Sequence, residues 1–187
     1  RMLLSLVKPG NGSIELFGMD LLKHRKEILR QVGAIIERPD LYKYLTALEN
    51  LRIFANLSGK KISTKKLQGQ LEMVGLAERA HSKVKTYSQG MKQRLGIAIA
   101  LVHDPQLIIL DEPTNHLDLE SITAFNNALK DFPGTVLFTT HDHEFTQTVA
   151  NRIIEITPNG HIDRLMTYDE YISSENIVAQ KEALYAE

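Results

Sequence analysis

The chain contains no cysteine among its 187 residues, which excludes disulfide bonds, thiolate metal sites and a cysteine nucleophile. No apolar run approaches the roughly 18 residues that a membrane-spanning helix needs. Charge is balanced at a net −1, so nothing favours DNA as a direct partner, and the lysine pairs at 60–61 and 65–66 are interpreted as a solvated face. No signal peptide is visible and Arg1 is not an initiator methionine, so we expect a cytoplasmic protein whose natural N-terminus lies upstream.

Apolar runs predict the strands of an α/β fold. Residues 107–110 are branched and apolar without a polar break, which is typical of a parallel strand buried on both faces. Similar runs predict two more buried strands at residues 32–36 and 135–139. An alternating pattern predicts a half-buried strand at residues 13–18, and two short runs predict an antiparallel hairpin of residues 153–156 with 161–165. The chain is long enough for one domain with a real core. We therefore expect a single α/β domain with a mostly parallel sheet.

Helical patterns are concentrated in the middle of the chain. Thr46 and Glu49 fit a capping box that opens a helix. Further helices are predicted at residues 64–74 and 89–103, with shorter ones at 1–7, 21–30 and 119–130. The expected layout is an α/β core of residues 1–40 and 105–167, a helical subdomain of residues 41–104 and a helical tail of residues 168–187.

Two carboxylates follow the central predicted strand directly. Asp111 and Glu112 lie at its C-terminal end, and Pro113 stops the strand. Ligands of open α/β sheets bind at this edge. Burying two acids is costly without a counter-charge, and Mg²⁺ carried by a nucleotide would supply one. Asp111 would then hold the metal and Glu112 would polarise an attacking water, whereas the alternative is a solvated strand end.

A second candidate site is the start of the long helix. Ser88, Gln89 and Gly90 place a hydroxyl and a glycine at the end of a helix where unpaired N–H groups and the positive end of the dipole suit a phosphate. The alternative is an ordinary N-cap serine followed by a flexible glycine.

Two polar segments follow predicted strands at the same edge. His141 could meet a terminal phosphate beside Glu112, although residues 141–143 could instead form a metal pair without an evident third ligand, or a polar loop. Residues 115–118 follow the acidic pair closely enough to reach the same site or a facing subunit; alternatively, Asp118 caps the next helix.

These motifs, in this order and spacing, resemble the nucleotide-binding domain of ABC ATPases over essentially all 187 residues. Residues 108–112 resemble the Walker B strand with its catalytic glutamate, residues 88–91 the signature motif, residues 115–118 the D-loop, and His141 the switch histidine. The resemblance implies a P-loop NTPase-like sheet with a helical subdomain insert.

The resemblance also implies roles for these residues. ATP would be sandwiched between two domains packed head to tail. Asp111 would position Mg²⁺, Glu112 would activate water and His141 would contact the γ-phosphate. Ser88, Gln89 and Gly90 would close over the partner's nucleotide, and Asp118 would act across the interface.

The sequence departs from the family pattern in two places. No Gly-x-x-x-x-Gly-Lys-[Ser/Thr] occurs, and in the family that loop immediately precedes the segment that corresponds to residues 1–7. We therefore expect an N-terminally truncated domain that is inactive alone but active in its full-length parent. The second departure is Glu37, where the family usually has glutamine; its carboxylate could still bind Mg²⁺.

The two parts of the chain resemble different branches of the family. Residues 1–110 resemble the ATPase subunits of bacitracin- and lantibiotic-type exporters, whereas residues 111–187 resemble the ABC-F class, which acts on ribosomes. The first interpretation is therefore an exporter subunit that works with a membrane permease at the inner face of the cell membrane. The alternatives are an ABC-F translation or antibiotic-resistance factor and a catalytically incompetent fragment, and the chain itself reads as a composite.

Overall fold

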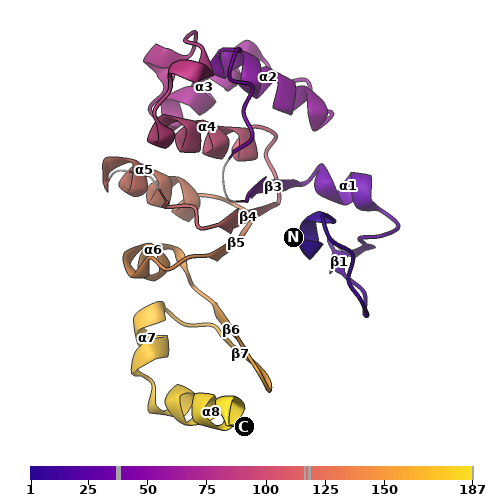
Figure 1. The fold of residues 1–187 in the computed structure, drawn as a ribbon, viewed down its shortest axis with the longest axis vertical. Coiled ribbons are helices and arrows are strands. Elements are labelled where there is room, and N and C mark those ends of the chain that lie inside the picture. The colour runs from indigo at the N-terminus through magenta and orange to yellow at the C-terminus, as the bar shows by residue number, and fades with distance from the viewer. Residues whose placement is uncertain (37–38, 116, 118, 187) are drawn as a thin grey trace. The chain divides into compact units, whose positions relative to one another are not determined.

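The computed structural model describes residues 1–36, 39–115, 117 and 119–186. Three parallel strands form its central sheet, in the order β3 (Val32–Ile35), β4 (Leu107–Asp111) and β5 (Thr135–Thr139) (Figure 1). The register sets Leu107 of β4 between Val32 and Thr135. The predicted α/β fold with a parallel sheet is confirmed, and Asp111 ends the middle strand.

The burial of the sheet differs between its strands. Leu107, Ile108 and Leu110 of β4 are buried, as predicted. The prediction that residues 135–139 are also buried is wrong: they alternate between exposed and half-buried, and Leu137 is 38% exposed. Within the described part of the chain β5 pairs with β4 alone. An apolar run therefore predicted the strand, but the exposure of its side chains depends on what packs against the faces of the sheet.

The N-terminal part of the chain forms smaller elements than predicted. A 3-10 helix at Met2–Leu4 ends where Ser5 takes a left-handed conformation (φ 55°), in place of a helix over residues 1–7. The half-buried strand expected over residues 13–18 is reduced to β1 (Glu15–Leu16), which pairs with β2 (Met19–Asp20). The helix expected over residues 21–30 is only α1 (Arg25–Leu29), because the Asp20 carboxylate accepts from Lys23 N at 2.9 Å and holds residues 20–23 in a turn. These elements bury Leu21 and Ile28 against Val32 and Leu107.

Three helices form a separate layer beside the sheet (Figure 1): α2 (Ala47–Leu57), α3 (Thr64–Met73) and α4 (Gln89–Leu101). The predicted capping box is confirmed, since Thr46 Oγ1 accepts from Glu49 N at 3.2 Å and Thr46 N donates to Glu49 Oε2 at 2.7 Å. Ser88 caps α4. α5 (Leu119–Lys130) follows β4 and buries Phe125 and Leu129.

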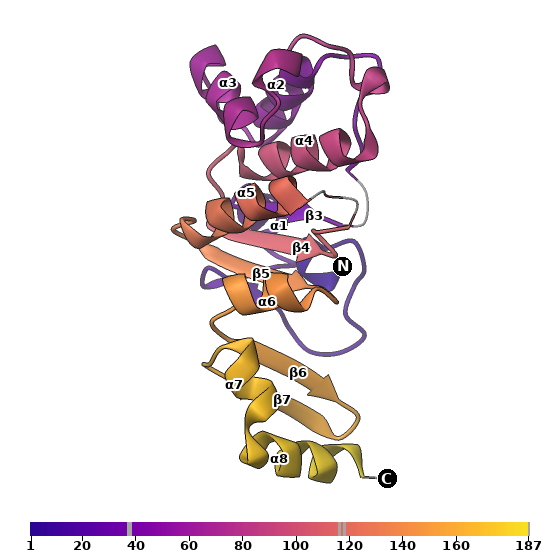
Figure 2. The ribbon, with the colours of Figure 1, turned by 90° about the vertical axis from the view of Figure 1, so that its left-hand side faces the viewer.

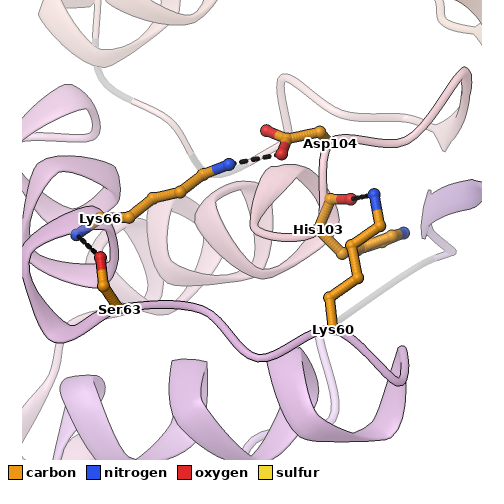
Figure 3. A network of polar contacts seen from close by, with 5 residues as sticks. All are labelled: Lys60, Ser63, Lys66, His103 and Asp104. Carbon is orange, nitrogen blue, oxygen red and sulfur yellow. Dashed lines mark hydrogen bonds and ion pairs between the residues drawn. The ribbon is translucent and has the colours of Figure 1, made fainter.

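Lys60 of the α2–α3 connection and Lys66 of α3 tie the helical layer to the turn between α4 and β4 (Figure 3). Lys60 Nζ donates to His103 O at 2.5 Å, and Lys66 pairs with Asp104. His103 is 8% exposed, and its Nε2 lies 3.2 Å from Val32 O. The turn between α4 and β4 is therefore also hydrogen-bonded to β3. Burial lowers the pKa of this imidazole, although the Val32 carbonyl opposes the shift. Lys60 and Lys66 are exposed, as the prediction of a solvated face requires, but each also contacts the turn between α4 and β4.

Residues Thr140–Glu187 form a second compact unit, distinct from Arg1–Thr139. It contains the predicted hairpin, β6 (Ile153–Thr157) with β7 (Gly160–Arg164), and a helical tail of α7 (Tyr168–Ser173) and α8 (Glu175–Tyr185) (Figure 2). A further helix, α6 (His143–Val149), was not predicted, although Asp142 caps it by accepting from Phe145 N at 2.9 Å. Among the described residues, no helix is both long and apolar enough to span a membrane.

The Glu155 carboxylate organises the second unit. It accepts hydrogen bonds from Lys181 Nζ at 2.6 Å, Tyr171 Oη at 2.7 Å and Tyr185 Oη at 3.1 Å. Burial disfavours the carboxylate, yet the hydrogen bonds from Lys181, Tyr171 and Tyr185 together hold the pKa of Glu155 below its usual value. Burial and the bond to Glu155 raise the pKa of Tyr171, which therefore remains a donor.

Replacing Glu155 by Gln should lower the free energy of unfolding of this unit by about 1–2 kcal/mol at neutral pH, because three bonds to a charged acceptor are weakened. The folded-state pKa of Glu155 lies below its unfolded value of about 4.5, so this stabilisation is present above that pH and is lost as the pH falls below it. Urea unfolding of wild type, E155Q and the exposed control E182Q at several pH values tests both statements. Equal stability of E155Q and E182Q at pH 7 would contradict them.

Candidate functional site

Asp111 is fixed at the carboxyl end of β4 by its neighbour strand. Its Oδ1 accepts a hydrogen bond from Thr139 Oγ1 at 2.7 Å, and the two residues are register partners at the ends of β4 and β5. The side chain is half-buried. The parallel pairing therefore sets a carboxylate and a hydroxyl side by side at the sheet edge where ligands of α/β folds bind.

Glu112 has an unusual backbone conformation. Its φ is 48°, in the left-handed region that residues other than glycine rarely adopt. Its N–H donates to Thr139 O at 3.0 Å, and its carbonyl accepts from Asn115 N at 3.3 Å. Strained backbone of this kind persists where surrounding contacts hold it, and it is concentrated at functional sites. The structure thus brings Asp111 and Glu112 together at one edge, both bonded to Thr139.

Ser88 at the start of α4 is an N-cap serine, which was one of the two interpretations of this segment, and the segment is also accessible to a ligand. Ser88 Oγ accepts from Met91 N at 3.2 Å, as an N-cap serine does. Ser88 and Gln89 are exposed, and Gly90 is half-buried. Gln89 also lines a cavity of about 390 Å³ with Lys43, Lys92 and Gln93. Phosphate binding by Ser88, Gln89 and Gly90 remains a prediction.

Sequence reasoning missed one contact near this site. Gln93, five residues after Ser88, is buried, and its side-chain amide donates to Pro113 O at 3.4 Å. The first turns of α4 therefore lie against the loop that follows Glu112. No local sequence signal indicated this contact, because its partner lies 20 residues farther along the chain.

The structure leaves the roles of three other predicted site residues, His141, Glu37 and Asp118, as predictions. His141 belongs to the second compact unit, and its role beside Glu112 remains a prediction. Glu37 and Asp118 lie outside the described residues.

The oxygen atoms at the sheet edge fit a hard cation such as Mg²⁺, provided that most of its ligands come from a nucleotide and water. No group of three or more His, Asp or Glu side chains able to hold a metal occurs in the part of the chain that the structure describes. Mg²⁺ in nucleotide sites is typically held by one or two carboxylates together with phosphate oxygens and water. Asp111, oriented by the Thr139 hydroxyl, meets that requirement.

A groove of about 600 Å³ lies between the helical layer and the sheet. Its walls are mainly apolar and include Leu29, Phe54 and Ile99, and Arg25, Lys26 and Arg30 from α1 and its C-terminus also line it. His103, which joins α4 to β3, is another lining residue.

The ABC transporter family matches residues 1–115, which is more than half of the chain. The chain belongs to the ABC transporter family. Bacitracin transport ATP-binding protein BcrA of Bacillus licheniformis is 53% identical over 120 residues, covering 63% of this chain and 38% of that protein. Lantibiotic transport ATP-binding protein SrtF of Streptococcus pyogenes is 36% identical over 180 residues, covering 95% of this chain and 75% of that protein.

Solved structures of ABC proteins have the same fold. One ATP-binding subunit of an ABC transporter aligns with a TM-score of 0.78 at 26% identity, over 94% of this chain and 75% of that one. A dimeric ATP-binding cassette in a post-hydrolysis state, bound to ADP and Pi, aligns with a TM-score of 0.71 at 26% identity, over 82% of this chain and 72% of that one. The predicted resemblance to the ABC family and to its bacitracin and lantibiotic branch is confirmed. This chain spans about half or less of the length of several curated ABC relatives that it matches.

Proposed function

We propose that this chain is the ATP-binding and ATP-hydrolysing domain of an ABC exporter of antibiotic peptides. The observation that carries the proposal is the pair Asp111 and Glu112 at the carboxyl edge of β4, each bonded to Thr139. The similarity to bacitracin and lantibiotic transport ATP-binding proteins supports the exporter branch.

In this proposal the residues of the site have separate roles in binding Mg-ATP and hydrolysing it. Asp111, oriented by Thr139, would hold Mg²⁺, which when bound neutralises charge on the nucleotide phosphates. Glu112 would orient the attacking water and accept its proton. His141 would donate to the γ-phosphate, and Glu37 would offer a second carboxylate to the metal. Ser88, Gln89 and Gly90 would close over the nucleotide of a facing domain, with Asp118 at the interface between the two.

Two protein partners follow from this proposal. The first is a second ABC domain packed head to tail, which the dimeric structural relative supports. The second is a membrane permease, for which the groove beside α1 is the proposed docking site. Its apolar walls and its three basic side chains, Arg25, Lys26 and Arg30, suit an amphipathic helix that carries acidic residues. The protein would then lie at the inner face of the cell membrane.

The second candidate function is that of an ABC-F factor on the ribosome. The residues that favour it are those at 115–122, 140–143 and 157–160, which resemble that class. Such a factor carries two cassettes in one chain and needs no permease.

Detection of the natural protein in its source cells, with an antibody to this segment, separates the two functions. A product of about 220–320 residues, of the order of one or two typical domains, supports the exporter subunit. A product of more than about 500 residues supports two fused cassettes and the ABC-F function. Purified natural protein should hydrolyse Mg-ATP in either case, and a protein without that activity would overturn the proposed chemistry.

A further inference from the structure

Gln93 is a polar side chain in the apolar interface of α4. It is only 5% exposed, and the loop residues Pro113 and Thr114 are buried as well. Burying a side-chain amide without a hydrogen bond costs free energy, so a buried glutamine normally has a hydrogen-bond partner.

The amide group of Gln93 contacts one backbone atom in the loop after Glu112. Nε2 donates to Pro113 O at 3.4 Å, across 20 residues of sequence. Proline has no N–H, so the carbonyl is the only hydrogen-bonding group that the backbone of Pro113 possesses. Gln93 therefore fixes the peptide that directly follows the Glu112–Pro113 bond.

Glu112 is held from three directions. Its N–H is bonded to Thr139 of β5, its carbonyl accepts from Asn115 farther along the loop, and Gln93 bonds the next carbonyl from α4. With φ at 48°, the conformation of Glu112 costs free energy and must be held by such contacts. Loss of the bond from Gln93 would remove a contact that ties the loop after Glu112 to α4.

α4 is a firm support for this contact. A Cβ on Gly96 would lie 2.7 Å from Pro39 Cβ, and a Cβ on Gly33 would lie 2.2 Å from Ala100 O, so the helix packs closely on both sides. Ser88 caps its start. A side chain on such a helix can set the position of a loop.

We propose that Gln93 is a positioning residue, which holds the backbone of Glu112 in the conformation that aims its carboxylate at the reacting water. This assignment rests on the proposed function, in which Glu112 is the base. It adds a link between the helix that begins at Ser88 and the loop that carries Glu112, so a displacement of α4 is transmitted to the carboxylate.

Steady-state ATP hydrolysis by the natural protein tests the role in catalysis. Q93M keeps the length and burial of the side chain but removes the donor, and it should lower kcat about fivefold with KM for ATP within twofold. Q93E should lower kcat at least as much at neutral pH, and its loss relative to wild type should shrink at lower pH, where the carboxyl O–H can donate. The matched control Q68M, at an exposed position of α3, should match wild type. Unchanged kcat in Q93M, or a rise in KM with kcat intact, would overturn the assignment.

Amide hydrogen exchange on this 187-residue chain tests the positioning without hydrolysis. Q93M should speed exchange at Glu112 and Asn115, whose N–H groups are bonded to Thr139 and Glu112, and leave the amides of α3 unchanged. Equal exchange in Q93M and wild type would overturn the positioning role. A natural protein that does not hydrolyse ATP would overturn the proposed function alone, because the exchange result stands by itself.

Discussion

Glu112→Gln should lower kcat for ATP hydrolysis by the natural protein by on the order of 10²–10⁴, the usual contribution of a general base. Nucleotide affinity should stay within a few-fold of wild type, since glutamine keeps the size of the side chain and the bonds from Glu112 N to Thr139 O and from Asn115 N to Glu112 O belong to the backbone. The loss should therefore appear in kcat and not in KM.

Single-turnover hydrolysis and equilibrium binding of a nucleotide analogue separate these two effects. The control is E72Q, the same chemical change at an exposed position of α3, which should hydrolyse ATP at the wild-type rate. Hydrolysis by E112Q at the parental rate would assign the base to another residue. Loss of analogue binding in E112Q would show that the carboxylate acts in binding.

Elements set by local sequence patterns were predictable. The apolar runs at Val32–Ile35 and Leu107–Asp111 are strands in parallel pairing, and the side chains of Thr46 and Ser88 cap α2 and α4. In each case the signal lies within a few residues, as a run of branched side chains or a hydroxyl before an apolar face. α6 shows how such a signal can be missed, since Asp142 is an ordinary N-cap that was read only as a polar loop residue or a metal ligand.

Features that depend on contacts between distant segments were not predictable. Lys60 and Lys66 are solvated lysines by sequence, yet their partners His103 and Asp104 lie 43 and 38 residues away. Whether the side chains of β5 are buried depends on what packs against the two faces of the sheet, and its own residues carry no signal for that.

The candidate site likewise contains residues that the sequence predicts and contacts that it does not. The sequence alone predicts Asp111 and Glu112 at a strand end, because the apolar run, the acids and Pro113 are adjacent. Thr139 as their common partner follows from the register of β4 and β5, which a single strand does not specify. Gln93 was missed for the same reason, since its partner is the loop after another element.

Gly33→Ala should be among the most destabilising single changes in this chain, lowering the free energy of unfolding of the Arg1–Thr139 unit by about 3 kcal/mol or more. A Cβ at position 33 would lie 2.2 Å from Ala100 O and 3.1 Å from Ala100 C, which are backbone atoms of α4. A flexible side chain could rotate away, but here a strand or a helix must move. Displacing β3 would disturb its pairing with β4, and displacing the end of α4 would stretch the bond between His103 and Val32.

Gly69→Ala makes the same chemical change, but it should raise the free energy of unfolding. Gly69 lies within α3 with nothing within 4 Å of an added Cβ, and alanine is favoured over glycine in a helix by about 1 kcal/mol. Urea unfolding of both variants, compared at equal m-value, measures the two effects on one scale. Stability of G33A within 1 kcal/mol of wild type would mean that α4 and β3 can separate at little cost. The tight approach of α4 to β3 would then not be the support that Gln93 needs to hold the loop of Glu112.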